Sequence, residues 1–231
     1  IKDLPDVVKT MGQTACAITD HGVMYGVIDF YRSCKAAGVK PIIGCEVYVT
    51  PKGRSRFDKV HELDAESRHL VLLCENEEGY RNLSYLVSAG WTEGFYIKPR
   101  IDLELLRQYS SGLIALSACL AGEIPRRLRN GEYENAKNYA LELSDLFGPE
   151  RFYLELQDHG IPEQRAVNQG ILRLHQETGI PMVCTNDAHY LRKEDAEAHD
   201  VLLCIQTGKT IDDENRMRYE PRNFYLRREE E

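Results

Sequence analysis

Short apolar runs alternate along the chain with longer stretches in which apolar residues recur every three or four positions. Apolar runs of about four to eight residues are typical of buried strands, and the longer periodic stretches are typical of amphipathic helices. This pattern predicts six strands, at residues 15–18, 41–49, 69–73, 113–116, 152–156 and 182–184. The helices expected around them cover residues 3–12, 25–37, 78–88, 103–109, 122–129, 133–147, 163–178 and 193–204.

The alternation of strands and helices predicts an α/β fold with a parallel sheet, either closed or doubly wound. The 231 residues suffice for one large domain rather than two. Residues 50–68 lack periodicity and are expected to form a mobile surface loop, in which Lys52, Arg54 and Arg56 are candidate contacts to phosphate groups. Regularity is lost again near the end, so we expect a domain at residues 1–205 and a linker at 206–231.

Side chains that can bind metals gather where the predicted strands end. Asp187 and His189 follow the last strand, and a strand directs residues i and i+2 to the same face. The other strand ends offer Asp20, His21, Glu46, Cys119, Glu155, Asp158 and His159. Parallel strands place chemistry at their carboxyl ends, and His, Cys and carboxylate groups ligate zinc, manganese and iron. The pattern therefore favours one shared metal site.

Each candidate also has a structural interpretation. Asp187 could cap a helix, His21 could be a helix-entry residue, and Cys119 could be a small buried hydrophobe. Glu46 interrupts a buried strand with a charge, which is costly unless that charge is paired or bound to metal. His69 stands at the start of its strand, which is the wrong end for a site on a parallel barrel. Spacing alone therefore favours an ordinary strand histidine at that position.

Composition narrows the function classes. A formal net charge of −8 argues against binding of nucleic acid through overall positive charge. It does not exclude a site that handles phosphates through bound metal, because metal ligands themselves add negative charge. Seven cysteines without a CxxC pair predict reduced, intracellular thiols, and hence a cytoplasmic protein. No apolar run approaches the ~20 residues of a membrane span, so no membrane partner is expected.

Five motifs together resemble a known family: TDHG at residues 19–22, IIGCEVYV at 42–49, HLVLL at 69–73, LSACLAGE at 116–123 and TNDAHY at 185–190. They are similar to the polymerase-and-histidinol-phosphatase (PHP) domain, in the version found at the N-terminus of bacterial DNA polymerase III alpha subunits. The resemblance covers essentially the whole chain. It implies a distorted, TIM-like (β/α)7 barrel whose strand ends hold two or three divalent metals, with zinc or manganese favoured and magnesium an option.

The resemblance also implies a set of site residues. The metal ligands would be His21, Glu46, His69, Cys119, Asp187 and His189, of which Glu46, Asp187 and His189 would be catalytic. Asp20 and His159 would hold the ligand imidazoles in place. The family's first motif, an HxH pair on the first strand, has no counterpart here, so we expect that strand to be missing from this segment and the site to be partial.

The implied activity is metal-dependent phosphoester hydrolysis at the 3′ end of DNA, which is a proofreading 3′–5′ exonuclease. The implied partners are DNA, the rest of the polymerase alpha subunit and other replisome subunits. Two alternatives stay open, a non-catalytic structural domain of the polymerase and a small-molecule phosphatase of the histidinol-phosphate type. The phosphatase is disfavoured because residues 219–226 resemble the segment that leads from this domain into the polymerase.

Overall fold

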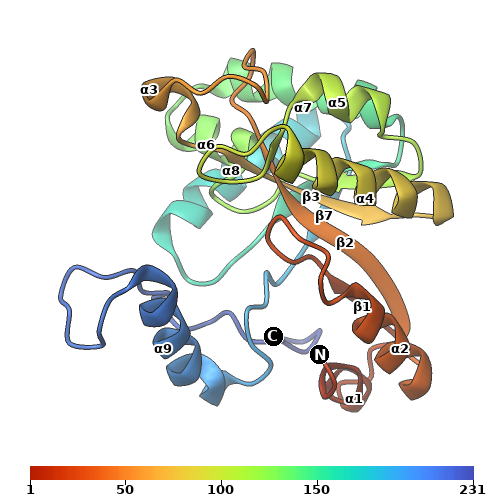
Figure 1. Cartoon of the computed structure of the whole chain (residues 1–231), viewed down its shortest axis with the longest axis vertical. Coiled ribbons are helices and arrows are strands. Elements are labelled where there is room, and N and C mark those ends of the chain that lie inside the picture. The colour runs from red at the N-terminus through yellow and green to blue at the C-terminus, as the bar shows by residue number, and fades with distance from the viewer.

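The computed structural model describes all residues, 1–231, and shows a mixed α/β fold built on a curled seven-stranded sheet (Figure 1). The sheet order is β1-β2-β3-β5-β6-β7, and the short β4 pairs with β2 on the side. The strands are β1 (Ala15–Ile18), β2 (Lys40–Val49), β3 (Arg68–Cys74), β4 (Arg100–Ile101), β5 (Leu113–Leu116), β6 (Phe152–Leu156) and β7 (Met182–Cys184). Six of these were predicted from the apolar runs, and β4 was not.

The alternation of strands and helices predicted a parallel sheet, but the observed sheet is mixed. β3 runs antiparallel to both of its neighbours, β2 and β5, whereas the pairs β1–β2, β2–β4, β5–β6 and β6–β7 are parallel. The start of β3 therefore lies at the edge where β2 and β5 end. His69 pairs with Tyr48, close to the end of β2. The inference that His69 stands at the wrong end of its strand is wrong for this reason.

The strand order is an open path, because β1 and β7 end it and do not pair with each other. The sheet thus curls into a half barrel (Figure 1). The α/β class is confirmed at this level. The complete seven-stranded barrel, with a first strand preceding this segment, stays a prediction.

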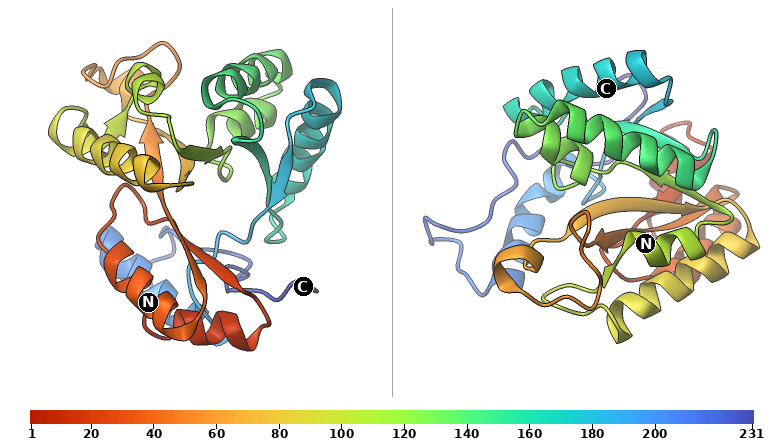
Figure 2. Two further views of the ribbon diagram at one scale, coloured as in Figure 1. Left: turned by 90° about the vertical axis from the view of Figure 1, so that its right-hand side faces the viewer. Right: turned by 90° about the horizontal axis from the view of Figure 1, so that it is seen from above.

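Nine helices and one 3-10 turn accompany the strands. They are α1 (Leu4–Thr10), α2 (Val27–Ala37), α3 (His61–Asp64), α4 (Glu77–Thr92), α5 (Leu103–Gln108), α6 (Glu123–Arg129), α7 (Tyr133–Phe147), α8 (Pro162–Thr178), the 3-10 turn η1 (Lys193–Asp195) and α9 (Ala196–Thr207). A core of 25 buried residues joins β2, β3, β5 and β6 to α4–α8, with α4 against β2 and β3, and α7 and α8 against β5 and β6 (Figure 2). A smaller core of six residues joins α1 and α2 to β1. No helix is both long and apolar enough to cross a membrane.

A buried arginine holds the loop between β2 and β3 in place. The guanidinium of Arg100, which is fully buried, donates to the carbonyl oxygens of Arg56, Asp58, Asp64 and Gly94 at 2.8–3.2 Å. The loop also contains the short helix α3. Residues 50–68 thus form a loop with a short helix, and the expected mobility of this loop stays a prediction.

The three cations proposed as phosphate contacts are already paired. Lys52 bonds Glu142 at 2.8 Å, and Arg54 bonds both oxygens of Asp64 at 2.7 Å. Arg56 bonds Glu93 at 2.8 Å and Asp102 at 3.2 Å. A phosphate would have to replace these partners, and the contact with phosphate stays a prediction.

The last part of the chain packs back onto the sheet. After α9 the segment has no further helix and no strand of the sheet. Tyr225 forms an isolated parallel bridge with Tyr190, and the carbonyl of Phe224 accepts the amide of His189 at 2.8 Å. The Phe224 side chain is buried at 6% exposure. The domain boundary at residue 205 stays a prediction, but residues 219–227 contact the carboxyl edge of the sheet.

Candidate metal centre

A single carboxylate oxygen joins two imidazoles at the centre of the candidate site. Glu46 Oε1 lies 2.7 Å from Nδ1 of His21 and 2.8 Å from Nδ1 of His69. The backbone fixes this contact, since His21 and Glu46 form a parallel bridge that extends the β1–β2 pairing. Glu46 is 4% exposed, whereas half of the His21 side chain is open to solvent. The carboxylate is therefore buried beneath a more accessible histidine.

Cys119 completes a triad with Glu46 and His69. Its Sγ lies 3.6 Å from Nδ1 of His69, and the potential ligand atoms of the three residues all lie within 4.8 Å of one another. Cys119 belongs to a tight turn after β5, in which Ala118 has φ 63° and the amide of Gly122 donates to the Cys119 carbonyl at 2.8 Å. A Cβ on Gly122 would lie 2.2 Å from the carbonyl oxygen of Ser117, so this turn requires glycine there.

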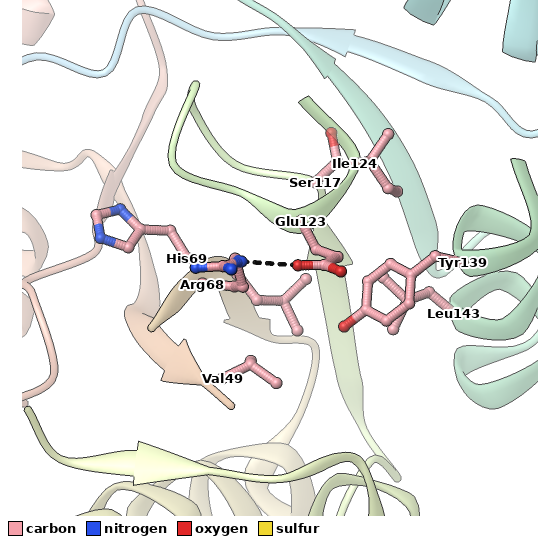
Figure 3. A pocket seen from close by; sticks show the side chains of 9 residues that line it. Val49, Arg68, His69, Ser117, Glu123, Ile124, Tyr139 and Leu143 are labelled. Carbon is pink, nitrogen blue, oxygen red and sulfur yellow. Dashed lines mark hydrogen bonds and ion pairs between the residues drawn. The ribbon is translucent and has the colours of Figure 1, made fainter. Parts of the chain in front are cut away.

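Arg68 and His69, the first two residues of β3, point in opposite directions and have different roles. Arg68 Nε donates to Glu123 Oε2 at 2.8 Å and closes a small pocket lined by Val49, Tyr139 and other residues (Figure 3). The ring of His69 points away from that ion pair (Figure 3). Consecutive strand residues face opposite ways, so Arg68 anchors α6 while His69 joins the site.

Asp187 and His189 approach the same cluster from the end of β7. The imidazole centroid of His189 lies 5.7 Å from that of His21, which lies 6.2 Å from that of His69. Nδ1 of His189 bonds the backbone carbonyl of Asp187 at 2.8 Å and lies 3.9 Å from Oδ1 of that residue. Donation from Nδ1 leaves Nε2 as the free, electron-pair-bearing nitrogen. Asp187 has φ 41°, a left-handed conformation that is uncommon outside glycine.

Burial and close charges shift the protonation of the site in opposite directions. Burial disfavours ionisation of Glu46, but the hydrogen bonds from His21 and His69 outweigh it and lower the pKa of Glu46 to about 2. The hydrogen bond to Glu46 raises the pKa of His21. Burial raises the pKa of both Asp187 and Cys119, and the charge of Glu46 adds to this. Without a cation, the site holds one carboxylate ionised and disfavours ionisation of the others.

The two residues expected to support the ligands act through the backbone. His159 is buried; its Nε2 donates to the carbonyl of Asn186 at 2.8 Å, and its Nδ1 accepts from Gln164 Nε2 at 2.8 Å. It thereby holds the residue before Asp187. The carbonyl of Asp20 accepts the amide of Glu46 at 3.0 Å. In both cases the contact positions a candidate ligand and reaches no imidazole of the cluster.

The structure adds aromatic residues that sequence reasoning missed. The rings of Tyr219, His199 and Phe224 lie 5.0, 5.6 and 5.4 Å from that of His189. Phe224 also stacks on His159 at 4.0 Å. Tyr219 and Phe224 belong to a segment without periodicity, which gave no signal of burial. His199 lies on α9, where it looked like one polar residue of an amphipathic helix.

The donor set suits a divalent cation. Ligands bound tetrahedrally to one Zn²⁺ at ~2.0–2.3 Å lie roughly 3.3–3.8 Å apart. The ligand atoms of Glu46, His69 and Cys119, which lie within 4.8 Å of one another, could therefore share one ion after shifts of about 1 Å. Glu155 adds an observation of the same kind, because its Oε2 is buried without a hydrogen-bond partner. Imidazole, thiolate and carboxylate together favour zinc or a similar first-row metal over calcium.

Comparison with known proteins assigns the chain to a family. Residues 1–159 match the PHP domain family. The chain is 46% identical over 223 residues to the DNA polymerase III subunit alpha of Treponema pallidum, covering 96% of this chain and 19% of that protein. It is 45% identical over 231 residues to the same subunit of Borreliella burgdorferi, covering 100% of this chain and 20% of that protein. The chain thus spans about a fifth of the length of these relatives.

A solved structure gives a further comparison. A crystal structure described as that of a candidate metal-dependent phosphoesterase from Bifidobacterium adolescentis is similar, with a TM-score of 0.48 and 14% sequence identity over 80% of this chain and 81% of that one. The match to residues 1–159 covers well over half of the chain. The chain therefore belongs to the PHP domain family, and its sequence is similar to about a fifth of bacterial DNA polymerase III alpha subunits.

Proposed function

We propose that this PHP domain, within an intact bacterial DNA polymerase III alpha subunit, hydrolyses the phosphodiester bond at the 3′ end of a DNA strand. The cluster of His21, Glu46, His69 and Cys119 supports this proposal most directly, because it gathers metal-ligating groups at one edge of the sheet. The activity would be a proofreading 3′–5′ exonuclease, working in the cytoplasm beside the rest of the alpha subunit and other replisome subunits.

Six residues would hold the metals: His21, Glu46, His69, Cys119, Asp187 and His189. Two or three divalent ions, zinc or manganese in preference to magnesium, would supply a water of lowered pKa and charge stabilisation for the phosphate oxygens. The hydrogen bonds from His21 and His69 hold Glu46 ionised, so a cation that replaced these donors would meet a charged carboxylate. Asp187 and Cys119 would release protons on metal binding, since ligands bind in their deprotonated forms.

The test uses the intact polymerase, end-labelled single-stranded DNA and pyrophosphate-free buffer with manganese. We expect release of nucleotides from the 3′ end and two or more metal ions per protein by elemental analysis. Asp187→Asn should lower nucleotide release by about 100-fold or more, because loss of a residue that binds the metal directly should cost more than loss of a residue that only orients a ligand. Polymerisation by the same variant should be unchanged.

The matched control is Asp158→Asn, which alters another strand-end aspartate. Asp158 is exposed, and its Oδ1 accepts the amide of Gly160 rather than facing the cluster. This variant should keep full nucleotide release. An intact polymerase that carries no metal and releases no nucleotides, yet polymerises normally, would contradict the proposal and favour a structural domain.

A further inference from the structure

An exposed aromatic pair stands beside the candidate metal centre. Trp91, near the end of α4, and Phe95 stack with ring centroids 5.4 Å apart at 20°, and each remains 44% exposed. Nε1 of Trp91 donates to the carbonyl of Gly22 at 2.8 Å, and Gly22 follows His21 directly. The indole is thus satisfied at its polar edge and fixed next to the candidate ligand, while the part of its surface that Phe95 does not cover stays accessible.

Lys98 supplies an unpaired cation near the histidines. It is exposed and forms no ion pair, in contrast to the paired Arg56 and Arg54 nearby. Its Nζ lies 5.3 Å from the centroid of the Tyr48 ring, which meets the ring of His69 edge-on at 5.2 Å. A cation held over an aromatic face beside the cluster suits a phosphate group that leads into it.

The loop that carries Phe95 and Lys98 is rigid. Tyr96 and Lys98 exchange both backbone hydrogen bonds, at 3.0 and 2.7 Å, around Ile97, which has φ 64° and is 52% exposed. This conformation is costly for a β-branched residue, and such strain persists only where its surroundings impose it. Arg100 anchors the loop by donating to the carbonyl of Gly94 at 3.1 Å. These contacts hold the backbone that carries Phe95 and Lys98.

We propose that Trp91, Phe95 and Lys98 form a platform that binds the unpaired end of a DNA strand, with bases stacked on the aromatic faces and a phosphate on Lys98. Proteins that bind single strands combine stacking aromatics with cations in this way. The inference rests on the proposed function, for which it supplies the binding site of the strand. A protein partner would need no unpaired cation directed towards the metal ligands, so the charge favours nucleic acid.

Trp91 is the single tryptophan of the chain, so its fluorescence reports on the platform alone. The 231-residue chain is titrated with oligothymidylate at low salt, once in EDTA and once with manganese and a phosphorothioate strand that resists hydrolysis. We expect the strand to quench Trp91 emission as a base stacks on the indole. An abasic strand of the same length should bind more weakly and quench little, because it carries phosphates without bases.

Two variants test the members of the platform. Phe95→Ala should weaken binding at least about fivefold, in line with the loss of one stacking partner. Lys98→Gln should reduce the slope of log affinity against log salt by about 0.7, as for one phosphate contact on a single strand. Tyr85→Ala is the matched control for Phe95, because Tyr85 lies on α4, the helix that carries Trp91, is equally exposed at 44% and stacks on Tyr109. Lys35→Gln on α2 is the control for Lys98.

Absence of quenching in both buffers overturns the platform, as does an equal loss of affinity in Phe95→Ala and Tyr85→Ala. Phe95→Leu, which keeps apolar volume without an aromatic face, replaces Phe95→Ala if circular dichroism shows that the latter is unfolded. Failure of the platform is distinct from failure of the proposed function. Quenching without metal-dependent hydrolysis leaves the platform standing, and hydrolysis without quenching overturns the platform alone.

Discussion

Arg100 is the largest fully buried side chain, and its burial is offset by contacts to four carbonyl oxygens. A buried charge is tolerated when every donor is satisfied, and the planar guanidinium directs its donors to several acceptors at once. The residue thereby ties the β2–β3 loop to the loop that carries Phe95 and Lys98. One side chain thus fixes two segments beside the candidate site.

Arg100→Lys should lower the free energy of unfolding by about 2–4 kcal/mol, because one ammonium cannot reach acceptors that a guanidinium spans. Urea unfolding followed by circular dichroism measures this. Arg107→Lys is the control, since Arg107 is exposed and pairs with Glu142 at the surface. That change should stay within about 0.5 kcal/mol. Equal effects of the two substitutions would contradict a special role for Arg100.

Asp64 should make the free energy of unfolding depend on pH. Its hydrogen bonds from Arg54 lower the pKa of Asp64 from its ordinary value near 3.8 to about 2. A carboxyl with a lowered folded-state pKa contributes stability above its unfolded pKa, and that contribution is lost as pH falls through the folded value. Asp64→Asn should therefore remove about 2 kcal/mol at pH 6 and much less at pH 2. A loss of the same size at both pH values would contradict this assignment.

His69 shows what residue patterns could and could not reveal about the site. Polar side chains at the ends of predicted strands indicated five of the residues, because a polar group buried in a sheet is costly unless it is paired or bound to metal. These residues are His21, Glu46, Cys119, Asp187 and His189. The same reasoning discounted His69, since it assumed a parallel neighbour. Strand direction depends on pairing across the sheet, and nothing within the run His69–Leu73 encodes it. Only the family resemblance had included this residue.

At the scale of elements, apolar runs located β5 and β6 at their observed limits, because their ends coincide with polar residues and turns. The two-residue β4 could not be predicted, since its pairing with β2 depends on the loop anchored by Arg100. The order of strands and the curl of the sheet likewise arise from contacts between distant segments.

The position of helix α4 depends on Gly79, because there is no room for a side chain at this residue. A Cβ on Gly79 would lie 1.8 Å from the carbonyl oxygen of Gly112, so the helix touches the start of β5 at this point. Alanine favours helices by about 1 kcal/mol over glycine, yet Gly79→Ala should destabilise the protein by about 1–3 kcal/mol because backbone must move. Thermal unfolding measures this. Glu78→Ala, at the exposed neighbour, should change stability by about 0.5 kcal/mol or less.

At the scale of the whole molecule, the two ends of the sequence share one region. Gln13 donates to the carbonyl of Arg227 at 3.2 Å, and Leu226 packs against the small core formed by α1, α2 and β1. The irregular segment after α9 therefore joins the N-terminal elements to the candidate site. Its lack of periodicity concealed this packing, because loop residues are buried one at a time rather than along a face.

Phe224→Ala should lower the free energy of unfolding by about 3–5 kcal/mol, as expected for removal of a buried aromatic ring. The ring fills the space between His159 and His189, so the variant should also bind manganese more weakly. Calorimetry measures both quantities. Phe57→Ala, at a residue that is 58% exposed, is the control and should leave both nearly unchanged. An unaffected Phe224→Ala protein would show that the segment is dispensable.

The closing of the sheet edge by residues 219–227 has a consequence for synthesis on the ribosome. Chains grow at roughly 5–20 residues per second, so His21 emerges on the order of ten seconds before His189 and Phe224. During that interval Glu46, His69 and Cys119 are already present, without the groups that enclose them. A cation captured at this stage would meet an incomplete shell and exchange freely. Selection of the final metal would thus follow synthesis of residues 219–227, once this segment folds over the histidines.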